Sequence, residues 1–135
     1  MVTLAQRFVD EIVVHARAED PNECCGVLLG RNGEVLALRR VTNAEHSPFR
    51  YNMDSQEFFG VYKEAERNGW EMWGFYHSHT HTQAYPSQTD RNLASWPDSY
   101  YLIVSLEDKA KPVLRAFRIL NGGTVEEHDI QVVPG

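Results

Sequence analysis

The chain has 135 residues, of which 42% are hydrophobic and 24% charged, and its net charge at pH 7 is -6. This length suits one domain over 1–135 with one core, and the composition is that of an ordinary soluble globular protein. Lys and Arg form no cluster, which argues against nucleic acid and against an anionic membrane surface as partners.

The N-terminal region carries charges at Arg7, Asp10 and Glu11, where a signal peptide would need an apolar core. No apolar run reaches transmembrane length, so the expected location is cytoplasmic. The two cysteines, Cys24 and Cys25, are adjacent, which excludes a disulfide framework. They lie in an apolar run and are better explained as small core residues than as metal ligands or a nucleophile.

The first expected element is an amphipathic helix over 3–17 with Thr3 as its N-cap. Its apolar residues recur every four positions, at Leu4, Phe8, Ile12 and Ala16.

Two apolar strands follow, over 23–30 and 35–41, and a hairpin turn at 31–33 joins them. The irregular segment 42–53 is long for a connection in a compact domain, and such loops often carry function.

A second helix is expected after Asp54, which forms a capping-box pattern with Glu57, and Asn68-Gly69 ends it. Its apolar side carries Phe58, Val61, Tyr62 and Ala65.

Further strands are expected over 73–76, 100–106, 113–120 and 125–133. A short helix begins at Ser87, continues from Asp90 to Trp96 and stops at Pro97. Together these elements predict an α/β (α+β) fold with a mixed, largely antiparallel sheet flanked by helices.

The stretch 74–90, GFYHSHTHTQAYPSQTD, concentrates the residues that carry chemistry. His77 and His79 alternate at the end of a buried strand, so both can face the same way. Asp90, in the first turn of the next helix, adds a carboxylate. Zinc takes such a mixed set, and three protein ligands leave a fourth position open, as in catalytic sites. His81 extends the alternation and is a rival ligand to Asp90, although it lies beyond the expected strand.

Hydrolysis at such a metal also needs a proton carrier, and Glu23, at the entrance of the first apolar strand, is the candidate. Partial burial would raise its pKa and suit it to this role; otherwise Glu23 is a solvated loop acid. Ser87 either caps the helix, which contributes ~1 kcal/mol, or donates to an oxyanion, and both roles can hold. Isolated histidines, by contrast, are expected to be solvated or internally satisfied: His15, His46 and His128.

These residues resemble the JAMM (MPN+) metalloprotease motif. The sequence has His77-x-His79, seven residues, Ser87, two residues and Asp90, with an upstream glutamate in ECCGVLLG, at the motif's spacing. The likeness continues through TNAE with the following Ser-Pro, through YPS and TD, and through YYLIVS, so it covers nearly the whole chain. Within the family the chain is most similar to the small bacterial branch that releases cysteine from the C-terminus of a ubiquitin-like sulfur-carrier protein.

The resemblance implies that His77, His79 and Asp90 bind Zn2+, that Glu23 is general base and then general acid, and that Ser87 is the oxyanion donor. It also implies a cytidine-deaminase-like MPN/JAMM fold, a curved sheet between helices. Members of the family cut the amide after the Gly-Gly tail of a ubiquitin-like protein. The expected function is therefore zinc-dependent removal of cysteine or a short C-terminal extension from such a carrier.

An extended Gly-Gly tail can add to a sheet edge by backbone hydrogen bonds, and a narrow channel then rejects residues with side chains. The segments 42–53 and 83–85 flank the expected site in sequence and are candidates for the channel walls. Within them, the candidate substrate-binding residues are Asn43, Ser47, Arg50 and Tyr85. Arg50 would hold the carboxylate of the released amino acid; otherwise it is a solvated loop side chain.

Two other functions compete with the peptidase. A catalytically silent MPN scaffold that binds a ubiquitin-like partner would share the fold, although all five chemical positions of the motif are present. A zinc deaminase would also share the fold, but its motif pairs a histidine or cysteine with a glutamate two residues later and adds Pro-Cys-x-x-Cys. Neither pattern occurs in this sequence. His81 is one departure from the JAMM pattern, where a small residue is expected.

Overall fold

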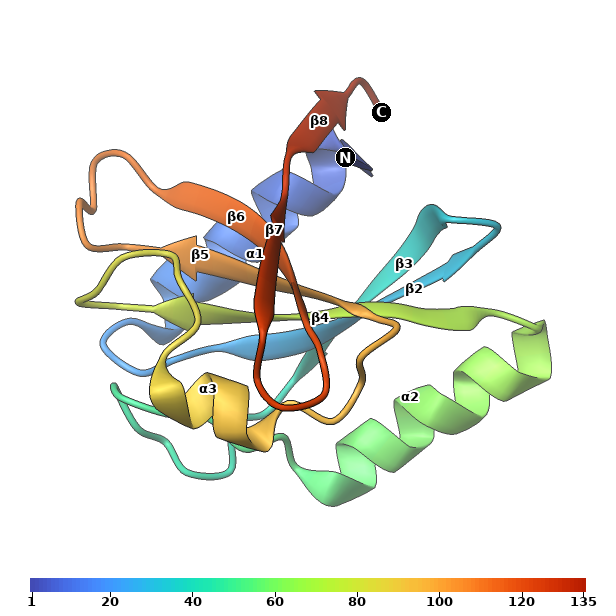
Figure 1. Ribbon diagram of the computed structural model, residues 1–135, viewed down its shortest axis with the longest axis horizontal. Helices are drawn as coiled ribbons and strands as arrows, with labels where there is room; N and C mark the ends of the chain where they lie inside the picture. The colour runs from blue at the N-terminus through green and yellow to red at the C-terminus, as the bar shows by residue number, and fades with distance from the viewer.

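The computed structural model describes residues 1–135 as two sheets and three helices (Figure 1). The larger sheet is built from six strands: β2 (Cys25–Arg31), β3 (Glu34–Val41), β4 (Glu71–His79), β5 (Tyr100–Ser105), β6 (Val113–Ile119) and β7 (Val125–His128). Their order is β3-β2-β4-β5-β6-β7, and every neighbouring pair is antiparallel except β4 and β5. The predicted fold class, a mixed and largely antiparallel sheet flanked by helices, is confirmed.

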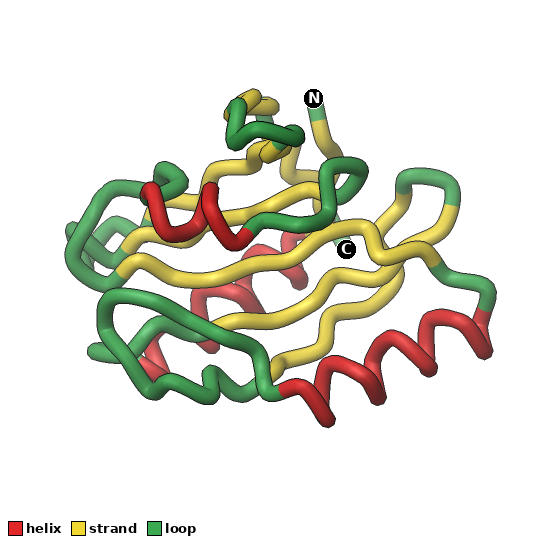
Figure 2. Tube along the Cα trace, turned by 60° about the horizontal axis from the view of Figure 1, so that its bottom comes forward, coloured by secondary structure: helices red, strands yellow, loops and turns green.

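Helices cover both faces of this sheet. Helix α1 (Gln6–Glu19) packs on one face, and α2 (Ser55–Asn68) and α3 (Gln88–Leu93) lie on the other side, as Figure 2 shows with α1 behind the strands. None of the three helices is both long enough and apolar enough to cross a membrane.

The alternation of side chains along each strand divides the core into two layers. The layer shared with α1 includes Leu28, Tyr76 and Leu102. Their neighbours one residue earlier, among them Val27 and Phe75, pack against the α2 side. From Phe75 onward the odd-numbered residues of β4, including its two histidines, therefore face the α2 side. Before that point the register shift opposite Leu28 and Leu29 reverses the alternation, and Trp73 lies in the α1 layer.

The N-terminus differs from the prediction. Thr3 lies in a strand, β1 (Val2–Ala5), which pairs in parallel with β8 (Ile130–Val133), and no side chain caps α1. The prediction of Thr3 as N-cap was therefore wrong. Leu4 is buried as predicted, but from the strand, because a spacing of four to Phe8 also fits a strand that runs into a helix.

Two other boundaries also shift. The strand expected over 125–133 is divided at Asp129, so that β7 pairs with β6 while β8 pairs with β1. The helix expected to reach Trp96 ends at Leu93, and the Trp96 ring packs against Phe75 at 5.4 Å between centroids. The half-buried indole therefore lies on non-helical backbone, where the prediction placed the last turn of the helix.

The capping of α2 follows the prediction in part. Asp54 accepts a hydrogen bond from the Glu57 N–H at 3.2 Å, and Gly69 ends the helix at a φ of 66°. The Glu57 carboxylate, however, accepts from the backbone N–H of Thr42 at 2.9 Å. The helix start is therefore tied to the beginning of the loop that precedes it. Tyr62 is partly exposed, at 38%, instead of lying on a buried face.

His15 is buried, and its Nδ1 lies 2.7 Å from the hydroxyl of Tyr76, so it is a satisfied core residue as expected. The Tyr76 ring lies over Gly26, where a Cβ atom would come within 2.2 Å of it. Glycine at position 26 is therefore what allows the tyrosine to lie across the neighbouring strand.

Candidate active site

His77 and His79 lie at the C-terminal end of β4, near the middle of the sheet, and only 1% and 3% of their surfaces are exposed. Their alternation places both rings on the α2 side, and their Nε2 atoms are 3.2 Å apart. The predicted convergence of the two imidazoles is therefore present in the structure.

Asp90 reaches the same point from α3. Ser87 is the N-cap of this helix, with the Asp90 N–H donating to Ser87 Oγ at 3.0 Å and the Ser87 N–H donating to Asp90 Oδ2 at 2.9 Å. This capping box fixes the carboxylate, whose Oδ2 lies 3.1 Å from His77 Nε2 and 3.0 Å from His79 Nε2. The hydrogen bonds that cap α3 therefore also hold Asp90 Oδ2 beside the two imidazoles.

The three facing atoms fit a divalent metal ion. They are 3.0–3.2 Å apart, close to the edge of ~3.3 Å in a tetrahedron with metal–ligand bonds of ~2.0 Å. His79 Nδ1 lies 2.8 Å from the Gln83 carbonyl oxygen, which can only accept, so this nitrogen carries the proton. In the neutral ring the Nε2 lone pair of His79 then faces the Asp90 oxygen. Two acceptors in contact need a proton or a metal ion between them, and His77, His79 and Asp90 form the one group in the chain that could hold a metal ion.

The charges in the site follow from these contacts. Burial opposes ionisation of Asp90, but the two imidazoles and the Ser87 N–H outweigh it and lower the pKa of this carboxyl well below its usual range. Burial also lowers the pKa of His77, despite the attraction of Asp90. The pKa of His79 is raised, because its bonds to Asp90 and to the Gln83 carbonyl outweigh burial. Asp90 is thus an anion, and His77 is kept neutral, the form that binds metals.

Glu23 lies two residues before the start of β2 and is 4% exposed. Burial raises the pKa of its carboxyl to about 8; the His79 ring opposes this shift and the Asp90 charge adds to it, so Glu23 lies within electrostatic range of both. Its Oε1 is buried without a hydrogen-bond partner. An unpaired buried carboxylate oxygen is costly, and it is typical of a group that has a partner during the reaction.

The loop 42–53 holds the backbone of Glu23. The Glu23 N–H donates to the carbonyl of Ser47 at 2.9 Å, and Asn43 Nδ2 donates to the Glu23 carbonyl at 3.0 Å. Asn43 is buried; its Nδ2 also donates to the Arg50 carbonyl at 3.1 Å, and its Oδ1 accepts from two backbone N–H groups of the loop at 3.0 and 3.1 Å. Four hydrogen bonds to groups of the chain itself therefore occupy the donors and the acceptor of the Asn43 amide.

The same loop places Tyr51 against His77, one of the three candidate metal ligands. Its ring stacks on His77, with the centroids 4.5 Å apart and the planes inclined by 26°. The sequence places this aromatic in a long loop without giving it a role. Only the position of the loop opposite β4 reveals the contact.

The remaining candidate residues are Arg50, Tyr85 and His81, and each contacts another residue of the chain. Arg50 is exposed and its Nε lies 2.9 Å from Glu45 Oε1, while the partly exposed Tyr85 packs edge-on against Phe117 at 5.4 Å. His81 lies outside the ligand group, with its Nδ1 2.7 Å from Thr80 Oγ1.

Comparison with known proteins agrees with this geometry. Residues 5–120 match the profile of Prok-JAB, the prokaryotic homologs of the JAB domain. The chain belongs to this family. The Prok-JAB chain is 44% identical over 122 residues to the CysO-cysteine peptidase of Mycobacterium tuberculosis, covering 89% of this chain and 84% of that protein. It is 39% identical over 111 residues to a desampylase of Haloferax volcanii, covering 77% and 80% of the two chains.

Solved structures give the same answer for the fold. A protein of Desulfitobacterium hafniense superposes with a TM-score of 0.88 at 38% identity, covering 100% of the Prok-JAB chain and 94% of that chain. A JAB1/MPN domain protein of Archaeoglobus fulgidus shares the fold, with a TM-score of 0.63 at 20% identity and coverage of 98% and 99%. The predicted family is confirmed, and with its peptidase relatives the chain is a JAMM-type metallopeptidase.

Proposed function

We propose that this Prok-JAB protein is a zinc peptidase that cleaves the amide after the C-terminal Gly-Gly of a ubiquitin-like sulfur carrier, releasing cysteine or a short extension. The convergence of two imidazoles and a carboxylate within 3.2 Å, beside a buried glutamate, carries the proposal. Its substrate class rests on the family resemblance. It is supported by relatives named CysO-cysteine peptidase and, in Thermus thermophilus, probable TtuB-protein conjugate cleaving protease.

Zinc is the ion we assign to His77, His79 and Asp90, because two imidazole nitrogens and one carboxylate oxygen are a frequent zinc donor set. When bound, zinc would act as a Lewis acid toward the scissile carbonyl and make water more acidic. The chain's own residues then supply the proton transfers.

Glu23 is assigned as the general base that takes a proton from the attacking water and as the general acid that returns it to the leaving amine. A proton carrier works best when its pKa is near the working pH, and burial raises the pKa of Glu23 to about 8. A carboxyl with an ordinary pKa would be a weaker base in this reaction.

Ser87 is assigned as the oxyanion donor. Its Oγ accepts the helix-capping bond from the Asp90 N–H, and this leaves the hydroxyl hydrogen free to donate to the developing negative charge. The capping role and the catalytic role are therefore compatible.

Asn43 and Ser47 are assigned to positioning. Both bond to the backbone of Glu23, and the Asn43 amide has no capacity left for a substrate. Arg50 and Tyr85 remain our candidates for substrate contact, since both side chains reach solvent and their segments flank the site in sequence.

The test is cleavage of a small carrier protein ending in Gly-Gly-Cys, followed by mass spectrometry. We expect loss of the terminal cysteine with the wild-type protein, and loss of cleavage with His79→Ala, with Glu23→Gln and after treatment with a chelator. Undiminished cleavage in any of these three cases would contradict the mechanism. A protein that binds the carrier without ever cleaving it would instead be a silent scaffold.

A further inference from the structure

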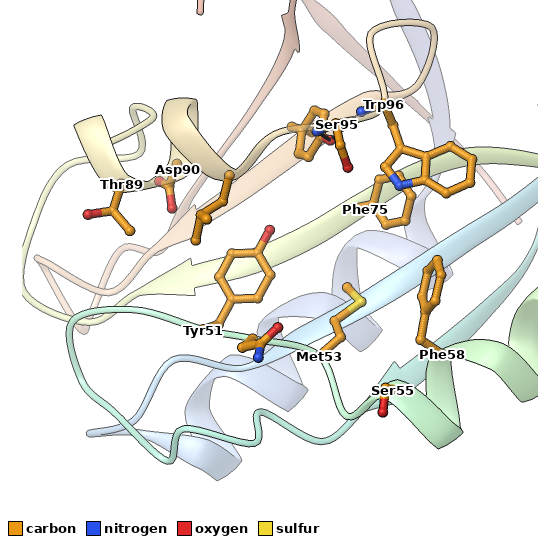
Figure 3. A pocket seen from close by; sticks show the side chains of 12 residues that line it. Tyr51, Met53, Ser55, Phe58, Phe75, Thr89, Asp90, Ser95 and Trp96 are labelled. Atoms are coloured by element: carbon orange, nitrogen blue, oxygen red, sulfur yellow. Dashed lines mark hydrogen bonds between the residues drawn. The ribbon is translucent and has the colours of Figure 1, made fainter.

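A cavity of about 340 Å³ lies beside the metal-ligand group on the α2 side of the sheet (Figure 3). Asp90 lines one end of it, together with Tyr51, whose ring stacks on a metal ligand. The cavity is therefore continuous with the proposed catalytic centre. At its other end, Figure 3 shows the aromatic side chains Phe58, Phe75 and Trp96.

The far end of the cavity is apolar and lined by aromatic rings. The three rings contact one another in pairs, with centroids 5.4 Å apart for Phe75 and Trp96 and 6.2 Å apart for Phe58 and each of the other two. Asp90 is the one carboxylate in the lining, no basic residue takes part, and the carboxylate is engaged by the two imidazoles. Such walls favour an apolar occupant and disfavour a charged one.

Strand register shows which part of a substrate would enter the cavity. Cys25 is paired with His77 and β2 runs antiparallel to β4, so Glu23 lies toward the His79 end of β4. Phe75 lies on the opposite side of His77 along the same strand. Under the proposed function Glu23 returns a proton to the leaving amine, which places the leaving group on the Glu23 side. The acyl part of the substrate then extends toward the cavity.

The distance between His77 and Phe75 along β4 indicates which substrate residue can reach the cavity. Phe75 is two residues from His77, which is roughly 6.6 Å in a strand, and an extended Gly-Gly spans about the same length. The two glycines have no side chains with which to fill the cavity. The first side chains that can reach Phe75 and Trp96 therefore belong to the residues just before Gly-Gly.

We propose that this aromatic cavity is a specificity site for an apolar side chain at one of the two carrier positions that precede Gly-Gly. This inference rests on the proposed function and adds a sequence preference to it. It also gives Tyr51 and Met53 of the loop 42–53 a place in the wall of the substrate channel.

The experiment compares kcat/KM for carriers ending in Gly-Gly-Cys, with Leu, Ala or Asp placed at each of the two preceding positions in turn. We expect the Leu carrier to exceed the Asp carrier by ~10-fold or more at one of these positions, as for burial of one side chain in an apolar pocket. Equal kcat/KM for all carriers would overturn the specificity site while leaving the peptidase intact. No cleavage of any carrier would contradict the proposed function and this inference with it.

Two variants test whether the preference for Leu over Asp arises in the cavity. Leu93 lines the rim and is 62% exposed, so Leu93→Lys adds a positive charge there without opening the core. We expect this variant to retain zinc and to lower the Leu-to-Asp ratio at least several-fold. The control is Phe59→Ala, because Phe59 neighbours Phe58 on α2 but is 59% exposed and lies outside the cavity. A Leu-to-Asp ratio unchanged by Leu93→Lys, or equally lowered by Phe59→Ala, would overturn the assignment.

Discussion

Asn43 Nδ2 donates a hydrogen bond to the backbone carbonyl of Glu23 at 3.0 Å, and so joins the loop 42–53 to the proposed proton carrier. The same loop stacks Tyr51 on His77 and accepts the Glu23 N–H at Ser47. One segment therefore contacts both the proposed proton carrier and a candidate metal ligand. The proposed activity depends on this loop as much as on the residues that touch the metal.

Asn43→Asp replaces a donor that faces two carbonyl oxygens with an acceptor, so the support of Glu23 should fail. We expect kcat to fall by ~10- to 100-fold, with KM and bound zinc little changed, because the metal ligands are untouched. Steady-state kinetics and elemental analysis check this. Asn121→Asp, in the exposed turn after β6, is the matched control. Full kcat in a folded Asn43→Asp protein would contradict the positioning role.

Glu23→Gln keeps the shape of the side chain and removes its ability to accept a proton. We expect kcat to fall by ~100- to 10,000-fold while the protein still binds one zinc ion. Mass-spectrometric rates and metal analysis together check this outcome. A variant that loses zinc along with activity would show that Glu23 supports the metal site and not the proton transfer.

Because Glu23 is buried, the stability of the metal-free protein should depend on pH. Its pKa in the folded state is raised from 4.5 to about 8, so the fold favours the neutral carboxyl. This contribution to stability is complete below pH ~4.5 and is lost as the pH rises through about 8. Glu23→Gln should therefore gain stability over wild type between pH 5 and pH 9, by up to ~4 kcal/mol. Urea unfolding in the presence of a chelator measures the difference, and a constant difference across this range would contradict the burial.

Ser87 has two roles that one substitution can separate. Ser87→Gly removes the hydroxyl, but glycine is a tolerable N-cap, so the loss of stability should be only a few tenths of a kcal/mol, ~0.3. We expect kcat to fall by ~100-fold because the oxyanion loses a donor. Thermal unfolding and kinetics check the two effects separately. A stable Ser87→Gly protein with normal kcat would leave Ser87 as a helix cap alone.

Tyr51 supports His77 by stacking, with the ring centroids 4.5 Å apart. Tyr51→Phe keeps the ring and should bind zinc as wild type does. Tyr51→Leu removes the ring, and we expect zinc affinity to fall by ~3- to 10-fold. Competition with a chromogenic chelator measures both affinities. Equal affinity for the Phe and Leu variants would show that the stacking does not stabilise the ligand.

The parts of the site that sequence predicts are those built from local geometry. His77 and His79 alternate on one strand, and Ser87 and Asp90 share one capping box, so spacing alone places their side chains. Local patterns were sufficient for these four residues. For Glu23 the sequence left open whether the side chain is buried or solvated, and the structure shows that it is buried.

The parts that sequence misses depend on non-local contacts. Thr3 joins a strand because the C-terminal segment pairs with it, and the periodicity of 3–17 carries no sign of that partner. The bond from Asn43 to Glu23 and the stacking of Tyr51 on His77 likewise join segments that are distant in sequence. Asn43 was expected at the substrate channel because its loop flanks the site. The structure shows that its amide faces inward, where four hydrogen bonds use it.

The central claim is that a single zinc ion, held by His77, His79 and Asp90, makes this protein a peptidase. The most direct test removes the metal with a chelator and titrates zinc back while cleavage of a Gly-Gly-Cys carrier is measured. We expect activity to vanish in the metal-free protein and to return linearly, with saturation at one zinc ion per chain. Full cleavage by protein shown by elemental analysis to contain no metal would contradict the claim.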